Sequence, residues 1–201
     1  MASNREPIKT TIQEIVDYWF ARIDESQLSV DKAEAHERCW RCGCHRNLQR
    51  CHIIPDSLGG KDEPSNLVLL CKRCHADGPN VSDPQIMWDW IFSYKVPLYD
   101  TFWGILGQRE YRFIYGKTMI EELKSLGIDT PKKVQQYSSI LNENVYKKAS
   151  RHFGQPYLNT DTIAGLYRMA LKKIAEELGQ TFPKKETGEQ AVKSPWWMQM
   201  E

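Results

Sequence analysis

Long apolar runs are missing from this chain of 201 residues. Apolar stretches such as "NLVLL" at 66–70 fall far short of the roughly 20 residues that a membrane-spanning helix needs. The first residues, "MASNREPIKTT", also lack the apolar core of a signal peptide. We therefore expect an intracellular, cytoplasmic protein with no membrane partner.

A strong charge imbalance is also missing, because the formal net charge is only +1. That value excludes a global electrostatic reason to bind nucleic acid, so any such argument must be local. One local run exists, since the segment from Arg38 to Pro55 contains four arginines and no acidic residue. It predicts a cationic face beside the cysteines, with an ordinary solvated surface as the equal alternative. The arginines are Arg38, Arg41, Arg46 and Arg50.

Cysteine is absent outside residues 39–74, where all six lie. In a reducing compartment such a cluster favours metal ligation over a disulfide framework. Two Cys-x-x-Cys pairs, Cys39 with Cys42 and Cys71 with Cys74, stand 28 residues apart. Two intervening residues allow a tight turn to point both sulfurs at one ion, so the four thiolates predict a structural Zn²⁺. Cys44 is the nearest substitute ligand.

Helical periodicity surrounds this cysteine segment on both sides. At the N-terminal side, Thr11 and Glu14 form the pattern of a capping box. Further along, Asp83 and Pro84 are typical of a helix start. The stretch 98–116 is aromatic and of ambiguous period. The pattern predicts helices over residues 11–23, 30–38, 82–94, 118–126, 131–152 and 160–178.

The chain accordingly divides into four predicted parts. An N-terminal helical segment covers 1–35, the chemical module 36–80 and a helical region 81–180, and the residues 181–201 form a flexible tail. The helical region contains no nucleotide-binding loop, catalytic triad or second metal signature. Its apolar stripes predict a core extension, with target recognition or dimerisation as alternatives. A homodimer therefore remains open.

The stretch between the cysteine pairs, "LQRCHIIPDSLGGKDEPSNLVLLCKRCH", resembles the HNH or ββα-metal endonuclease family. The resemblance rests on His52 in "HIIP", Asn66 in "SNLVLLC" and His75 after the second pair, with Gly59 and Gly60 between them. It implies a two-stranded hairpin and a helix around a catalytic divalent metal, plus a separate structural zinc. The expected fold class is α+β and mostly helical, with this module between helical segments.

The resemblance also implies roles for the three landmark residues. His52 is the candidate general base, because imidazole titrates near neutral pH and can accept a proton from attacking water. His75 is the candidate ligand of the catalytic ion, Mg²⁺ or another divalent cation. Asn66 either binds that ion through its amide oxygen or holds the loop that positions His52. Arg46 and Arg50 are the candidate phosphate contacts.

Cys51 departs from the family pattern, which places an acidic residue or a histidine before the general base. A thiolate would favour zinc over magnesium, whereas a cysteine facing the core would behave as a small apolar residue. We favour the core position. Asp56, Asp62 and Asp77 then stand as supplementary metal ligands.

These patterns predict a metal-dependent endonuclease that hydrolyses phosphodiester bonds. DNA is the expected substrate, with RNA as an alternative and restriction or defence against phage as candidate settings. The competing hypothesis is a zinc-stabilised module that binds nucleic acid or protein without cleaving it. The survival of His52, Asn66 and His75 together favours the enzyme.

Overall fold

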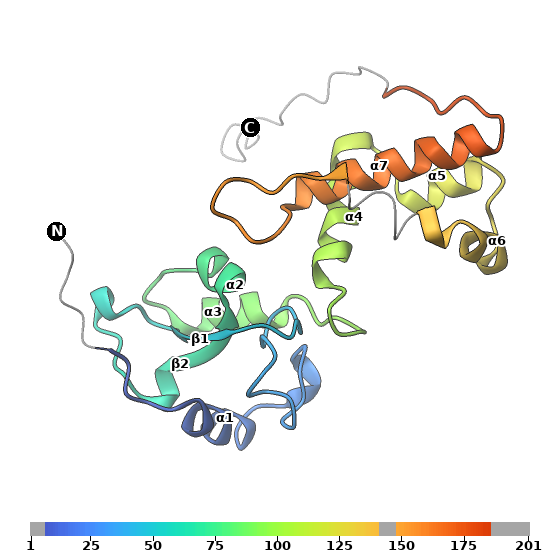
Figure 1. Cartoon of the computed structure of the whole chain (residues 1–201). Coiled ribbons are helices and arrows are strands. Elements are labelled where there is room, and N and C mark those ends of the chain that lie inside the picture. The colour runs from blue at the N-terminus through green and yellow to red at the C-terminus, as the bar shows by residue number, and fades with distance from the viewer. Residues whose placement is uncertain (1–6, 141–147, 186–201) are drawn as a thin grey trace, which may run out of the picture. The chain divides into compact units, whose positions relative to one another are not determined.

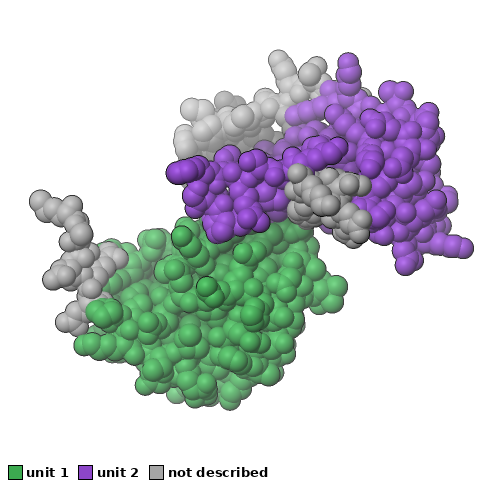
Figure 2. Space-filling model, viewed as in Figure 1, with its two compact units in different colours: residues 1–105 green, residues 106–201 purple. Residues whose placement is uncertain are grey.

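The computed structural model describes residues 7–140 and 148–185, and its elements are labelled in Figure 1. The chain divides into two compact units, residues 1–105 and residues 106–201, which Figure 2 distinguishes by colour. The first unit contains the cysteine segment and an antiparallel two-stranded sheet, and the second is built from helices. Within the described residues, no helix is both long and apolar enough to cross a bilayer.

A small hairpin with helices packed against it forms the centre of the first unit (Figure 1). The strands pair antiparallel, with Leu48 opposite Cys71 and His52 opposite Leu67. Short 3-10 turns, Asp56–Leu58 and Pro64–Asn66, interrupt the long connection between them. The main elements of this unit are α1 (Ile12–Phe20), β1 (Leu48–His52), β2 (Leu67–Cys71), α2 (Lys72–Asp77) and α3 (Pro84–Phe92).

The predicted cap at Thr11 starts α1, where the Thr11 side chain accepts from the backbone N–H of Glu14 at 3.2 Å. The Glu14 carboxylate accepts in turn from the Thr11 backbone N–H at 2.7 Å. This helix packs against β2, and the indole N–H of Trp19 donates to the carbonyl of Leu67 at 2.8 Å. Every residue of β2 is buried, because α1 and α2 both cover it.

Two of the predicted helices differ from the structure. Residues 32–37 form turns, and Arg38 pairs with His45 in an isolated bridge, because this segment folds back to place Cys39 beside Cys44. The predicted helix over 131–152 is interrupted at Tyr137, where α6 (Pro131–Gln136) ends, and residues 149–152 are not helical. Part of that predicted helix, residues 141–147, lies outside the described residues.

The second unit has a core of its own. Its helices are α4 (Phe102–Tyr115), whose first residues belong to the first unit, α5 (Met119–Ser125), α6 and α7 (Thr160–Glu177). Tyr111 and Leu171 are fully buried in that core. A Cβ at Gly107 would lie 2.3 Å from a methyl carbon of Ile163, so glycine permits α4 and α7 to approach closely.

Candidate functional site

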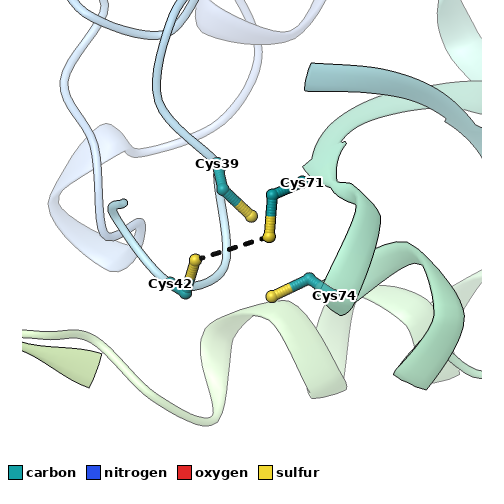
Figure 3. A group of neighbouring side chains, drawn as sticks. All are labelled: Cys39, Cys42, Cys71 and Cys74. Carbon is teal, nitrogen blue, oxygen red and sulfur yellow. Dashed lines mark hydrogen bonds between the residues drawn. The ribbon is translucent and has the colours of Figure 1, made fainter. Parts of the chain in front are cut away.

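The four predicted zinc ligands converge on one point, although they come from separate parts of the first unit (Figure 3). Cys39 and Cys42 lie in the loop before β1, Cys71 ends β2 and Cys74 lies in α2. Their sulfurs all lie within 4.8 Å of one another, and the Cys42 and Cys71 sulfurs are 3.9 Å apart. Zn–S bonds of about 2.3 Å require sulfur separations of about 3.8 Å in a tetrahedron, so this set fits zinc.

Main-chain hydrogen bonds preorganise this zinc centre. The N–H of Gly43 donates to the carbonyl of Cys39 at 2.8 Å, which closes the turn between the first two ligands. Gly43 has a φ of +65°, a conformation that glycine adopts without strain. The N–H of Trp40 donates to the carbonyl of Leu69 at 3.1 Å and fastens the turn to β2. A zinc ion here would tie this turn to the hairpin end and to α2. Cys44 is buried near the turn but is not part of the four-sulfur group.

The arginine-rich segment does not form the predicted cationic face. Arg41 is only 7% exposed, and its guanidinium stacks 3.7 Å from the Trp90 ring centroid and bonds to the Trp90 carbonyl. Arg38 forms ion pairs with Glu34 at 2.5 Å and with Asp100 at 3.1 Å. Two of the four arginines therefore hold the fold together. Sequence spacing did not reveal the contacts with Trp90 and Asp100, because these partners lie about 50 to 60 positions away in the chain.

A hollow of about 1420 Å³ lies beside the hairpin, and both candidate catalytic histidines line it. His52 is the last residue of β1, and His75 comes from α2, which follows β2 directly. The sequence separates them by a long connection, but the hairpin brings them to one surface. Arg50, Cys51 and Asp62 line the same hollow. Of the predicted catalytic and phosphate-contacting residues, His52, His75 and Arg50 thus share the hollow, whereas Asn66 and Arg46 do not line it.

The His75 ring is oriented by Gln49 of the facing strand. Its Nδ1 lies 2.9 Å from the side-chain oxygen of Gln49, an atom that can only accept a hydrogen bond. Nδ1 therefore carries the proton, and Nε2 keeps a lone pair. Burial, reinforced by the nearby His52, lowers the pKa of His75 and favours its neutral form. A neutral, oriented imidazole is the form that ligates a metal ion.

Asn66 fastens the loop between the strands. Its side-chain oxygen accepts from the backbone N–H of Ile54 at 2.9 Å. Its amide nitrogen donates to the carbonyls of Ile54 at 3.1 Å and Lys61 at 3.0 Å. These bonds fix the loop that follows His52, so the geometry gives Asn66 the loop-holding role. Ligation of a metal ion by Asn66 stays a prediction.

Cys51 lies on the opposite side of β1 from its neighbour His52 and is 4% exposed. Burial raises the pKa of its thiol to about 12. A neutral thiol in this environment behaves as a small apolar side chain, in agreement with the favoured core position. Cys51 nevertheless borders the hollow that His52 and His75 line.

The two predicted phosphate contacts are separated by the structure. Arg50 lines the hollow, and its guanidinium donates to the Thr10 carbonyl at 2.9 Å. Arg46 is exposed and does not line it. A third cationic residue, Lys9, does line it, because Asp62 accepts from the backbone N–H of Lys9 at 2.6 Å. No sequence signal linked Lys9 to this site, since the contact spans more than fifty positions.

A second metal ion is less well provided for than the zinc. Among the described residues, the four cysteines are the one cluster of three or more His, Cys, Asp or Glu side chains close enough to share an ion. Around the hollow, both carboxylate oxygens of Asp62 accept backbone N–H groups, from Lys9 and from Thr10. An imidazole and a thiol do not fit the oxygen-rich set that Mg²⁺ prefers. The His75 imidazole fits a borderline cation such as Zn²⁺ or Ni²⁺.

Comparisons with known proteins agree with this geometry. Residues 39–87 match a family model described as HNH endonuclease. The matched segment contains all four cysteines, the hairpin and α2, and it ends inside α3. No curated protein matches the chain, and no solved structure matches it. The match confirms the predicted family resemblance for residues 39–87. The structure confirms the predicted α+β, mostly helical fold class.

Proposed function

We propose that the chain is a divalent-metal-dependent endonuclease that hydrolyses phosphodiester bonds in DNA, with His52 as the general base. The match to the HNH endonuclease family supports nuclease-type chemistry in general. The observation that carries the specific proposal is that His52 and His75, from different elements, line one hollow beside a zinc-binding cysteine cluster. A purely structural zinc module would not require either histidine there.

The proposed roles follow from what each side chain can do. His52 accepts the proton of the water that attacks phosphorus, as the 3′ oxygen departs in line with the attack. Asn66 keeps the loop after His52 in place through its bonds to Ile54 and Lys61. Arg50 and Lys9 are the cationic groups that could contact a phosphate in the hollow, which Asp56 and Asp62 also line. Bound through Nε2 of His75, a borderline divalent cation would neutralise charge on the phosphate and the departing oxygen.

The test is cleavage of plasmid DNA by the His52→Ala variant with magnesium, manganese, nickel and zinc in turn. We expect the cleavage rate to fall by about 10²- to 10⁴-fold, the range for loss of a general base. His36→Ala serves as the matched control, because His36 is an exposed histidine of the same unit that does not line the hollow. Elemental analysis should find the same zinc content in both variants.

Two results would contradict the assignment. Cleavage by His52→Ala at the parent rate would exclude His52 as the base. Failure of the parent chain to cleave DNA or RNA with any of the four cations would instead support a zinc-stabilised binding module. RNA is included as a separate substrate because the hollow itself contains no feature that distinguishes a ribose from a deoxyribose.

A further inference from the structure

The small net charge of the chain conceals a marked separation of charge between the two units. Residues 1–105 contain 12 Lys and Arg against 15 Asp and Glu, a formal net charge of −3. Residues 106–201 contain 15 Lys and Arg against 11 Asp and Glu, a net charge of +4. Within 106–185 alone the excess is larger, 14 basic against 8 acidic residues. The unit that contains the proposed nuclease site is therefore the acidic one, a poor surface for a polyanion.

In the basic unit, a groove of about 550 Å³ gathers lysines from two segments. Lys172 lies on α7, and Lys184 and Lys185 follow that helix; all three are exposed. Glu176 is the acidic residue among those that line the groove. Three ammonium groups around one carboxylate leave a local excess of positive charge, which is unfavourable until an anion compensates it.

A buried network fixes the segment that holds two of these lysines. The Arg168 guanidinium pairs with Glu122 at 2.9 Å and donates to the Tyr111 hydroxyl at 3.1 Å. Its other terminal nitrogen donates to the carbonyl of Pro183 at 2.5 Å, and it lies 4.3 Å from the centroid of the Phe182 ring. The arginine thereby anchors the chain just before Lys184. These contacts fix the backbone at the groove, while the side chains of Lys172, Lys184 and Lys185 stay exposed.

We propose that this groove, lined by Lys172, Lys184 and Lys185, binds the phosphate backbone of double-stranded DNA. The inference rests on the proposed nuclease function, and it assigns substrate affinity to the helical unit and the chemistry to the other unit. Duplex DNA is the ligand because it is the substrate of the proposed nuclease and carries about one charge per 1.7 Å of its axis, a higher density than a single strand has. The contacts are to phosphate, so the groove contributes affinity and not sequence recognition.

The experiment measures binding of a labelled DNA duplex by the full chain carrying His52→Ala, over a range of salt concentrations. The groove variant adds Lys172→Ala, Lys184→Ala and Lys185→Ala. The matched control adds Lys117→Ala, Lys124→Ala and Lys132→Ala, three exposed lysines of the helical unit that do not line the groove. Loss of three phosphate contacts should reduce the slope of log K against log salt by about 2 to 3 and weaken binding at low salt at least about tenfold. The control should change neither quantity comparably.

The results of these measurements distinguish the proposed DNA-binding groove from the alternatives. Equal affinity and slope in the groove variant and the control would overturn the proposal, as would tighter binding of an RNA of equal length. A circular dichroism melt of each variant separates a folding defect from a binding defect. Cleavage assays on the chain with an intact His52 separate the two proposals. Groove-dependent DNA binding without any cleavage would support the groove and overturn the nuclease assignment.

Discussion

At the scale of single residues, the neighbouring positions Cys51 and His52 in β1 differ in exposure to solvent. Both residues line the hollow, but His52 is partly exposed, whereas Cys51 is only 4% exposed and burial raises the pKa of its thiol to about 12. Alternation along a strand requires this difference and explains why a cysteine is tolerated beside the proposed base. A departure from the family pattern at Cys51 is therefore compatible with a working site.

The raised pKa of the Cys51 thiol predicts that this residue resists alkylation in the folded protein. At pH 9 only about one thiol in a thousand would be ionised, so iodoacetamide should leave Cys51 unmodified in the folded protein. Folding favours the protonated thiol, so this contribution to stability is complete below the unfolded pKa of about 8.5 and is lost as the pH rises towards 12. Peptide mapping by mass spectrometry measures the modification. Rapid labelling of Cys51 at pH 8 without denaturant would show that it is accessible and ionised.

The orientations of Asn66 and His75 depend on hydrogen-bond partners that the sequence pattern does not show. The spacing of His52, Asn66 and His75 identified which side chains to examine. It did not show that Asn66 directs its whole amide to the Ile54 and Lys61 backbone, or that Gln49 orients His75. Hydrogen-bond partners depend on the path of the loop, which a residue pattern does not specify.

At the scale of elements, the loop between the strands is held by a close approach of backbone segments. A Cβ at Gly60 would lie 1.7 Å from the carbonyl oxygen of Ile54 and 2.7 Å from the amide nitrogen of Asn66. At the adjacent Gly59, with a φ of +87°, a Cβ would meet nothing within 4 Å. The two glycines looked equivalent in the sequence, yet Gly60 is required by packing and Gly59 by its backbone conformation.

Alanine substitutions at these two glycines should consequently differ. Gly59→Ala should cost about 1–2 kcal/mol, the cost of a left-handed conformation for a residue with a Cβ. Gly60→Ala should cost at least about 3 kcal/mol, because the Ile54 backbone must move and the Asn66 bonds must break. Urea unfolding of both variants, with zinc present, measures the difference. Equal losses of stability would show that the loop relaxes around the new methyl group.

Helix starts were the elements that local sequence predicted best. Thr11 and Glu14 form the expected capping box, and Asp83 accepts from the N–H of Gln85 at 2.9 Å as the N-cap of α3. Caps depend on residues within one turn, so they can be recognised without tertiary information. The predicted helix over 30–38 is wrong, because residues 32–37 form turns, and the predicted helix over 131–152 is interrupted at Tyr137.

At the scale of the whole molecule, the two units have different sources of stability. The first unit has a small hairpin core and a cysteine cluster that fits zinc. The second has an apolar core of its own, together with the buried pair of Arg168 and Glu122. Because metal binding contributes folding free energy where a site ties segments together, only the first unit should depend on zinc.

Removal of zinc by a strong chelator should therefore unfold the first unit selectively. Hydrogen exchange measured by mass spectrometry should show loss of protection in β1 and β2, while amides around Leu171 and Ile174 in α7 stay protected. Re-addition of zinc should restore the hairpin, which separates metal loss from irreversible damage. Simultaneous loss of protection in both units would show that they fold as one cooperative body.

The family resemblance predicted the hairpin and the landmark histidines, whereas the sequence by itself determined the four clustered cysteines and most helix starts. The cysteine cluster and the helix starts depend on short spacings and on residue types, and both can be read from the sequence. Only the tertiary structure decided that Arg41 is a buried stacking partner of Trp90, that Lys9 joins the hollow, and that Arg168 holds Lys184 near Lys172. These outcomes depend on contacts between distant segments, and such contacts exist only once the chain has packed.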